Sequence, residues 1–282
     1  MLRTPSVRVL GPADRDELLA LLDREPVADV FVASRVREAG LEAWRLGAEV
    51  WGWFDHGRLS AACYSGANLV PVQAGCEEHA LRAFADRARQ QGRRCSSIVG
   101  PAAMVNALWS VLEPHWGLPR AVRANQPLMA LDHPPEAAPD PAVRLVRPDE
   151  IDILLPAAIA MFTEEVGISP VAADGGRLYR ARVAELVSAR RALARIEDGR
   201  VVFKAEIGSA TSQACQVQGV WVDPVWRGRG LAVGGVAAVA AHALAHVAPV
   251  VGLYVNDYNA AAIAAYRHVG FRQVGTFATI LF

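Results

Sequence analysis

Apolar residues recur along the first half of the chain with two spacings, and together these predict an α/β protein. Alternation of apolar and polar residues predicts strands, which we place at 6–10, 48–54, 58–64, 68–72, 96–99 and 121–132. Spacings of three and four predict helices with one apolar face, which we place at 11–22, 27–38, 76–91 and 101–116. The pattern therefore predicts a sheet flanked by helices.

The second half repeats this order of elements without repeating the sequence. We expect strands at 142–147, 191–197, 200–207, 216–222, 250–255 and 271–282. Helices are expected at 148–164, 176–188, 229–247 and 259–269. Asp198-Gly199 is a strong hairpin signal between two of these strands. The shared order predicts two domains of one architecture.

A short proline-rich segment separates the two halves. Residues 133–141 contain four prolines in nine positions, a composition typical of a stiff, extended linker. We therefore predict one domain at 1–132, a linker at 133–141 and a second domain at 142–282.

Composition narrows the class of protein. The chain is 52% hydrophobic and 21% charged, with a formal net charge of +0, so no overall field attracts nucleic acid or an anionic membrane. Its four cysteines show no close spacing, as expected for free thiols in a reducing compartment, and the first residues lack a signal peptide. We expect a cytoplasmic protein with neither nucleic acid nor membrane as a partner.

One uncharged stretch is long enough to raise the alternative of a membrane span. Residues 231–256 contain no Asp, Glu, Lys or Arg, but His242 and His246 lie within them and Pro249–Gly252 interrupts them. A buried helix followed by a buried strand explains this stretch better.

A glycine- and arginine-rich loop follows the predicted strand at 216–222. Gly228 and Gly230 let the main chain approach a ligand, and the helix behind them begins with N–H groups that lack partners. Arg227 and Arg229 add charged donors. The arrangement of strand, loop and helix start predicts a phosphate-binding site. It lacks the Gly-Lys-Ser/Thr of a P-loop, and Gly234 comes one position late for a dinucleotide fingerprint.

Two motifs carry a resemblance to a known family. Val222-Asp223-Pro224, followed by Arg227, Gly230 and Ala232, resembles the acetyl-CoA pyrophosphate loop (Arg/Gln-x-x-Gly-x-Gly/Ala) of the GNAT family of N-acetyltransferases. Residues 253–271 resemble the later GNAT motif, through Asn259, Ala262, Tyr266, Gly270 and Phe271. The resemblance covers residues 143–282.

The resemblance implies a fold, a cofactor and a set of site residues. It implies two tandem GNAT-like α/β (α+β) domains, each a mixed, mostly antiparallel sheet flanked by helices, with acetyl-CoA as acyl donor. Val220, Trp221 and Val222 would contact the pantetheine arm. Tyr266 would donate a proton to the departing sulfur, after the amine attacks the thioester directly. The other implied cofactor-binding residues are Arg227, Gly228, Arg229, Gly230, Leu231, Ala232, Val233, Asn256, Asn259 and Ala262.

The general base is not evident, because the position that often carries Glu in the family is Gln216. Gln216 and Gln218 remain candidates for substrate binding. The replacement candidates are Glu206 on the preceding strand, and Glu164 and Glu165 at the end of the first helix of this half. A water chain, or an amine that is already neutral, is the alternative.

The first half departs from the family at the loop. Residues 70–78 carry one glycine, no arginine and two acids, which would repel a pyrophosphate. We therefore predict a degenerate GNAT-like domain that shapes the acceptor site or a dimer contact; an unrelated α/β domain is the alternative.

The leading prediction is an acetyl-CoA-dependent N-acetyltransferase that acts on a small-molecule or peptide amine, as a monomer or homodimer. The alternatives are an acyl-CoA-binding sensor without turnover and an NADP-binding oxidoreductase. No metal is expected, because the only metal-like pair, His242 and His246, has no third ligand.

Overall fold

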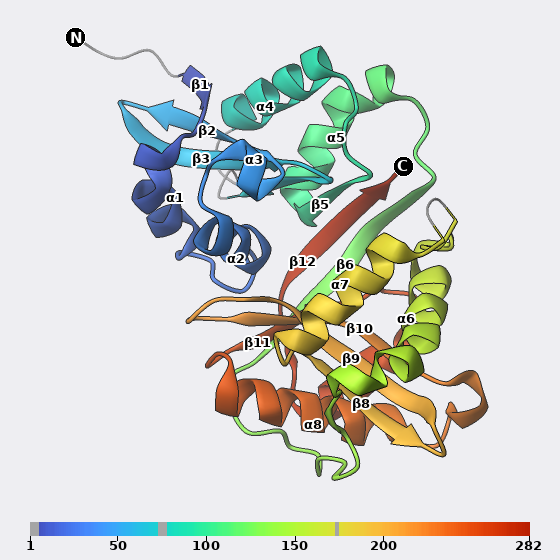
Figure 1. Ribbon diagram of the computed structural model, residues 1–282. Coiled ribbons are helices and arrows are strands. Elements are labelled where there is room, and N and C mark those ends of the chain that lie inside the picture. The colour runs from blue at the N-terminus through green and yellow to red at the C-terminus, as the bar shows by residue number, and fades with distance from the viewer. Residues whose placement is uncertain (1–5, 73–77, 173–174) are drawn as a thin grey trace. The chain divides into compact units, whose positions relative to one another are not determined.

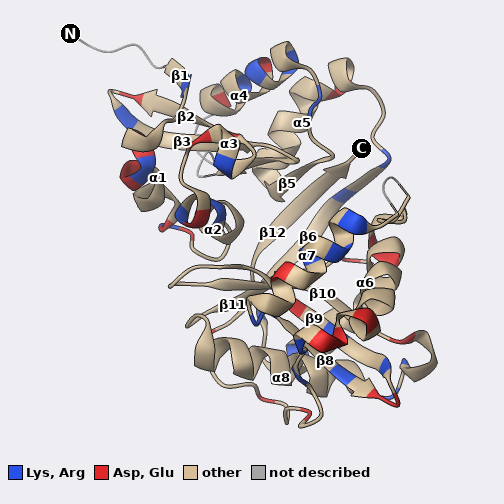
Figure 2. Cartoon of the chain, in the orientation of Figure 1, with Lys and Arg blue, Asp and Glu red and all other residues tan. Residues whose placement is uncertain are grey.

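The computed structural model describes residues 6–72, 78–172 and 175–282, and its contacts divide the chain into two compact units (Figure 1). The first unit comprises 1–128, 254–258 and 273–282, and the second comprises 129–253 and 259–272. Charged residues of both signs are interspersed over both units (Figure 2).

The first unit is a sheet with helices packed against it. Its strands lie in the order β1-β2-β3-β4-β5-β12-β6, and β4 pairs with β5 in parallel while the flanking pairs are antiparallel. The strands are β1 (Ser6–Val9), β2 (Glu49–Asp55), β3 (Arg58–Ser65), β4 (Asn68–Val72), β5 (Ser97–Pro101), β12 (Arg272–Leu281) and β6 (Ala121–Leu131). The helices are α1 (Arg15–Leu22), α2 (Val30–Ala39), α3 (Ala43–Leu46), α4 (Glu78–Gln91) and α5 (Ala102–Trp116).

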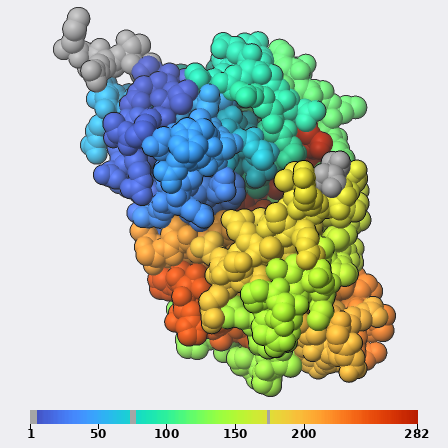
Figure 3. Space-filling model, viewed as in Figure 1, coloured from blue at the N-terminus to red at the C-terminus, as the bar shows by residue number. Residues whose placement is uncertain are grey.

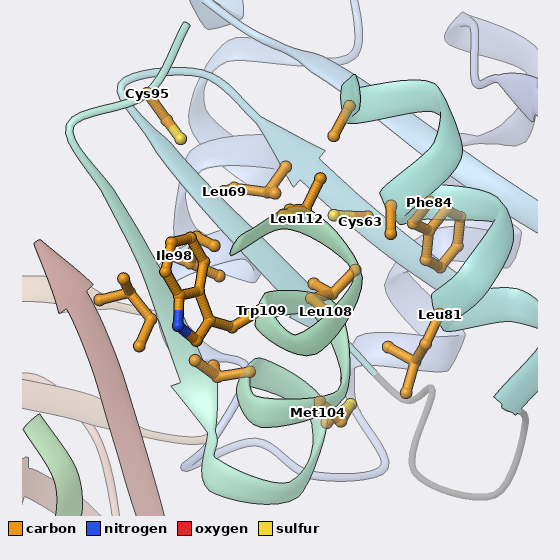
Figure 4. Close-up of a cluster of buried hydrophobic side chains, with 14 of the residues drawn as sticks. Cys63, Leu69, Leu81, Phe84, Cys95, Ile98, Met104, Leu108, Trp109 and Leu112 are labelled. Atoms are coloured by element: carbon orange, nitrogen blue, oxygen red, sulfur yellow. The ribbon is translucent and has the colours of Figure 1, made fainter. Parts of the chain in front are cut away.

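The helices α4 and α5 bury one face of this sheet. Phe84 of α4, Leu108 of α5 and Ile98 of β5 are fully buried in one apolar cluster, in which Trp109 of α5 lies beside Ile98 (Figure 4). Cys63 lies in the same core, where burial raises the pKa of its thiol. A buried thiol of this kind behaves as a small apolar side chain.

The last strand of the chain belongs to the first unit. Residues 277–281 of β12 pair antiparallel with β5, from Phe277 opposite Pro101 to Leu281 opposite Ser97. The division at 133–141 predicted from the sequence assigns these residues to the second domain. Strand pairing depends on which strand edges meet in space, and the amphipathic pattern of 271–282 carries no information about its partner.

The second unit follows the same order of elements. Its strands lie in the order β11-β10-β9-β8-β7. The strands are β7 (Arg144–Leu145), β8 (Ala192–Glu197), β9 (Arg200–Ala210), β10 (Cys215–Val222) and β11 (Val251–Tyr254). The helices are α6 (Ile151–Val166), α7 (Arg177–Ser188), α8 (Leu231–His246) and α9 (Ala260–Val269). The predicted fold class, a mostly antiparallel mixed sheet flanked by helices, is confirmed.

Alternation along β9 assigns the helices to opposite faces of the sheet. A Cβ atom on Gly235 of α8 would lie 2.5 Å from the Phe203 ring, so only glycine allows this helix to pack so closely. The next residue, Lys204, faces the other side, near Met161 of α6. In the space-filling view α6 and α7 cover the face of the second unit turned to the viewer (Figure 3).

The proline-rich segment 133–141 lies outside the helices and strands and is hydrogen-bonded to the second unit. The Glu136 N–H donates to the Val269 carbonyl (2.9 Å), and the Asp140 N–H donates to the Gly234 carbonyl (2.9 Å). The Asp140 carboxylate also pairs with Arg195. These contacts hold the segment against the first turn of α8 and the C-terminal end of α9.

The structure contains one helix that the sequence pattern did not predict, and it shows which elements the uncharged stretch 231–256 forms. The short helix α3 (Ala43–Leu46) was not predicted, because four residues are too few for a periodic pattern. Among the residues that the structure describes, no helix is long and apolar enough to cross a bilayer, so the uncharged stretch 231–256 forms α8 and β11 instead.

Candidate active site

The sheet of the second unit opens between β10 and β11. The two parallel strands pair only at Cys215 with Val251 and Gln216 with Gly252, at the start of each strand. Beyond Gln216 this edge of β10 has no strand partner in β11, so its main-chain groups can bind a ligand. The two strands therefore separate before β10 reaches Val222.

A bulge reshapes the same stretch of β10. Gln218 lies opposite Glu206 and Trp221 lies opposite Lys204, so β10 spans three steps where β9 spans two. Gly219 takes the extra position with φ +59°, a conformation that favours glycine. The bulge turns the main chain of Gly219 and Val220 out of the regular ladder.

The loop after β10 has the form expected of an anion-binding helix start. The Asp223 carboxylate accepts a hydrogen bond from the Val225 N–H (3.0 Å) and fixes the first turn of the loop. Gly228 (φ +75°) and Gly230 (φ +78°) then lead into α8. The first N–H groups of an α-helix lack intrahelical partners and carry about half a positive charge. The loop therefore offers both main-chain donors and a favourable dipole to an anion.

A cleft of about 640 Å³ connects these features. Its walls come from the end of β10, the glycine loop, the first turn of α8, and α9. The predicted residues that line it are Glu164, Val220, Trp221, Val222, Arg227, Gly228, Gly230, Leu231, Ala232, Val233, Asn259, Ala262 and Tyr266. The structure thus brings together residues from both sequence motifs.

Glu164 bridges the cleft from the end of α6. Its carboxylate accepts from the Arg227 guanidinium (2.6 Å) and from the Trp221 indole N–H (3.1 Å). Arg227 also donates from Nε to the Val222 carbonyl (3.0 Å). The arginine predicted to bind a pyrophosphate is therefore held by a carboxylate, and both oxygens of Glu164 are engaged.

Tyr266 is the buried phenol of the cleft. It lies on α9, is 7% exposed, and packs near Phe271. Burial, with a smaller contribution from the charge of Glu165, raises the pKa of Tyr266 above its ordinary value. The phenol is therefore protonated throughout the neutral pH range, as an ordinary tyrosine is, and has a proton to donate.

Glu206 and Lys204 form a buried ion pair next to the bulge. The Lys204 ammonium, which is 1% exposed and belongs to the only lysine of the chain, donates to Glu206 Oε2 (3.1 Å). Gln218 donates to Glu206 Oε1 (3.0 Å). A Cβ atom on Gly219 would lie 3.2 Å from the Glu206 carboxyl carbon, so the carboxylate sits directly beside the bulge. Lys204 is a residue that the sequence motifs did not indicate, although a lone lysine inside an apolar strand is a signal.

Glu165 lies at the exposed end of α6. Its charge contributes to raising the pKa of two tyrosines, Tyr266 of the cleft and Tyr179 of α7. Tyr179 itself donates to the Ala158 carbonyl (2.9 Å) and is a structural residue.

Several predicted residues make other contacts. The Asn259 side chain accepts from the Ala262 N–H (3.2 Å) and caps α9, although it also lines the cleft. The Asn256 side chain, which belongs to the first unit, accepts from Gln126 (2.9 Å). The Arg229 guanidinium stacks on the Trp226 ring at 5.0 Å. The predicted residues that do not line the cleft are Asn256, Arg229, Gln216, Gln218, Glu165 and Glu206.

The cleft also includes residues that the motifs missed. Trp226 belongs to the loop, and His268 lies two residues after Tyr266 on the solvent side of α9. No sequence signal distinguishes them, because both occur at positions that the motifs leave open.

One alternative, the NADP-binding oxidoreductase, loses support from this geometry. A dinucleotide-binding oxidoreductase requires a parallel sheet, but three of the four strand pairs of the second unit are antiparallel. Gly234, which would be the third glycine of a dinucleotide-binding loop, instead accepts a hydrogen bond at its carbonyl from the Asp140 N–H. No group of three or more potential metal ligands occurs in 6–72, 78–172 or 175–282.

The predicted loss of the phosphate loop in the first half concerns 70–78, of which 73–77 lie outside the described residues.

Comparison with known proteins gives a family for part of the chain. Residues 163–271 match the model of the acetyltransferase (GNAT) family, and residues 48–154 match a domain of unknown function, DUF4081. A comparison with the curated proteins gives no significant match.

Solved structures extend the similarity of fold to nearly the whole chain. A GCN5-related N-acetyltransferase from Sphaerobacter thermophilus is 19% identical, with a TM-score of 0.61 and coverage of 99% of this chain and 96% of that one. A GNAT-family acetyltransferase from Colwellia psychrerythraea is 12% identical (TM-score 0.58, coverage 98% and 99%). A tandem GNAT protein from the clavulanic acid biosynthesis pathway is 17% identical (TM-score 0.56, coverage 99% and 98%). The chain thus has the fold of GNAT proteins, and its residues 163–271 match the model of the acetyltransferase (GNAT) family.

Proposed function

We propose that this chain is an acetyl-CoA-dependent N-acetyltransferase whose chemistry takes place in the second unit. The observation that supports it most directly is the single cleft shared by the opened end of β10, the glycine loop and Tyr266. The match to the GNAT family model supports acyl transfer in general.

The residues of the cleft fit acyl-CoA. The glycine loop and the first turn of α8 offer main-chain N–H groups to a pyrophosphate. The unpaired edge of β10 offers alternating main-chain donors and acceptors to the amide groups of a pantetheine arm. Acetyl-CoA would supply the activated acyl group.

Three groups of the chain would act on the reaction. Tyr266, kept protonated by burial, donates its phenolic proton to the leaving sulfur. The bulge at Gly219 directs main-chain N–H groups at the position where negative charge develops. Glu206, beside that bulge, accepts the proton of the attacking amine, and Lys204 and Gln218 hold its two oxygens in place.

Calorimetric titration of acetyl-CoA tests the cofactor, and release of CoA thiol across a panel of amines tests turnover. Binding together with amine-dependent thiol release supports the proposal. Binding without turnover on any amine would favour the acyl-CoA sensor. No binding at all contradicts both.

Glu164→Gln should tighten the binding of CoA. The substitution removes a negative charge at the loop and frees Arg227, while the glutamine oxygen still accepts from Trp221. The Glu164–Arg227 pair is about half exposed, so we expect a decrease in Kd of only about threefold to fivefold. Calorimetry measures the change in Kd. Asp152→Asn is the matched control, because Asp152 lies at the other end of α6 and also pairs with an arginine, Arg180 of α7. An unchanged or weaker affinity would mean that Glu164 does not compete for Arg227.

Glu206→Gln should lower kcat by about 100-fold, the usual effect of removing a general base. The variant keeps an oxygen that can accept from Lys204, and its effect on the binding of acetyl-CoA should be small. Initial rates across pH 6 to 9 measure it, with Glu165→Gln in parallel. A larger loss for Glu165→Gln than for Glu206→Gln would transfer the role of base to α6.

A further inference from the structure

The second unit has another hollow, whose lining shares no residue with that of the cleft. Its volume is about 550 Å³, within the range of small-molecule sites. It is formed by the junction of α7 and β8, the turn between β9 and β10, and the last turn of α8. The lining residues are Ala189, Arg190, Arg191, Ala210, Thr211, Ser212, His242, His246 and Val247.

The titratable groups of this pocket are all basic. They are Arg190 and Arg191, after α7, and His242 and His246, on α8, and no carboxylate is among the lining residues. Neither arginine forms an ion pair with any described residue, whereas Arg180, Arg182 and Arg195 of the same unit are all paired. A concave surface of one sign of charge, with no internal counterion, concentrates anions.

Burial and the positive charge of the pocket lower the pKa of one of its own histidines. The imidazole rings of His242 and His246 lie 4.9 Å apart between their centroids. Burial lowers the pKa of His242, and His246 and Arg190 lower it further. Charge repulsion within an empty site of this kind is relieved when an anion binds.

The ends of two helices offset only part of this charge. Both α7 and α8 end at the pocket, and a helix C-terminus carries about half a negative charge, so together they neutralise about one of the two guanidinium charges. Stabilisation of helix ends alone therefore does not account for the cluster.

The position of Arg190 points the same way. The residue has φ +57° directly after α7, and the following Arg191 N–H donates to the Leu186 carbonyl (2.8 Å). Glycine is the preferred residue at this place of a helix end. An arginine here is at odds with the local backbone, as residues at functional sites often are.

We propose that this pocket binds a small anion that carries a phosphate group, such as inorganic phosphate or a phosphomonoester. The guanidinium groups of two arginines that line one pocket can both donate to the oxygens of a phosphate, and exposed Ser212 adds a hydroxyl donor. The site goes beyond the proposed acetyltransferase function and does not depend on it.

Titration of inorganic phosphate and of a nucleoside 5′-monophosphate tests the proposal. The protein is first saturated with CoA, so that the glycine loop is blocked, and the ionic strength is held constant with chloride. We expect saturable binding in the wild type, weakened about tenfold or more in Arg190→Gly/Arg191→Gln. The control, Arg177→Gln, removes an exposed arginine from the other end of α7 and should stay within about twofold of the wild type.

The double variant should remain folded, because glycine suits the backbone at position 190 and the Arg191 main-chain bonds persist. A thermal melt checks this. Phosphate binding that is equal in the double variant and the wild type, or no binding of either probe, would overturn the proposal. If the chain does not bind CoA, the comparison of these variants still decides the question.

Discussion

Gly230→Asp should weaken the binding of acetyl-CoA by at least about 100-fold. The substitution places a carboxylate at the N-terminus of α8, where the pyrophosphate would bind, and it fills the space through which the main chain approaches the ligand. A 100-fold loss corresponds to about 2.8 kcal/mol, at about 1.4 kcal/mol per tenfold change, which is reasonable for two negative charges in contact near a protein surface. Calorimetric titration measures the effect.

Gly199→Asp is the matched control for this substitution. Gly199 has φ +72°, close to the φ +78° of Gly230, and a Cβ atom at either position meets no atom within 4 Å. Both variants therefore carry the same backbone strain, and only one carries its charge into the cleft. If the two variants bind acetyl-CoA with equal affinity, the assignment of this loop to pyrophosphate binding is wrong.

Tyr266→Phe should lower kcat by about 100-fold and leave the affinity for acetyl-CoA within about twofold. Loss of a general acid typically costs two to four orders of magnitude, and the ring that packs in the cleft is retained. Release of CoA thiol and calorimetry measure the two quantities. Tyr64→Phe, at a buried tyrosine of the first unit, controls for loss of a buried hydroxyl. A Tyr266→Phe enzyme with the rate of the wild type would show that the sulfur leaves as thiolate or takes its proton elsewhere.

The pH dependence of the rate follows from the same burial. Because the pKa of Tyr266 is raised above its ordinary value, the phenol stays protonated, and its deprotonation cannot limit the rate near neutral pH. The rise of activity with pH should therefore report the deprotonation of the amine or of the base. Persistence of that rise in Tyr266→Phe, at a lower rate, is the expected result.

The features that could be predicted from the sequence are those that depend on residues close together in the chain. The loop at 227–233 is recognisable because glycines with positive φ and a following helix start are local requirements. Tyr266 is recognisable because its distance from Asn259 along one helix fixes its position relative to that helix start. The shared order of elements in the two halves also follows from local periodicity.

The sequence by itself therefore predicted most of the elements, and it singled out the glycine- and arginine-rich loop and the candidate acid. The tertiary structure decided that β12 pairs with β5, that Glu164 holds Arg227, and that Lys204 and Gln218 hold Glu206. The sequence pattern does not specify that β5 is the partner of β12, or that the end of α6 meets the loop that carries Arg227. The neighbours of Glu206 depend on the pleating of β9 and on the bulge in β10. Apolar periodicity records which face of an element is buried, and only the packed fold determines what that face meets.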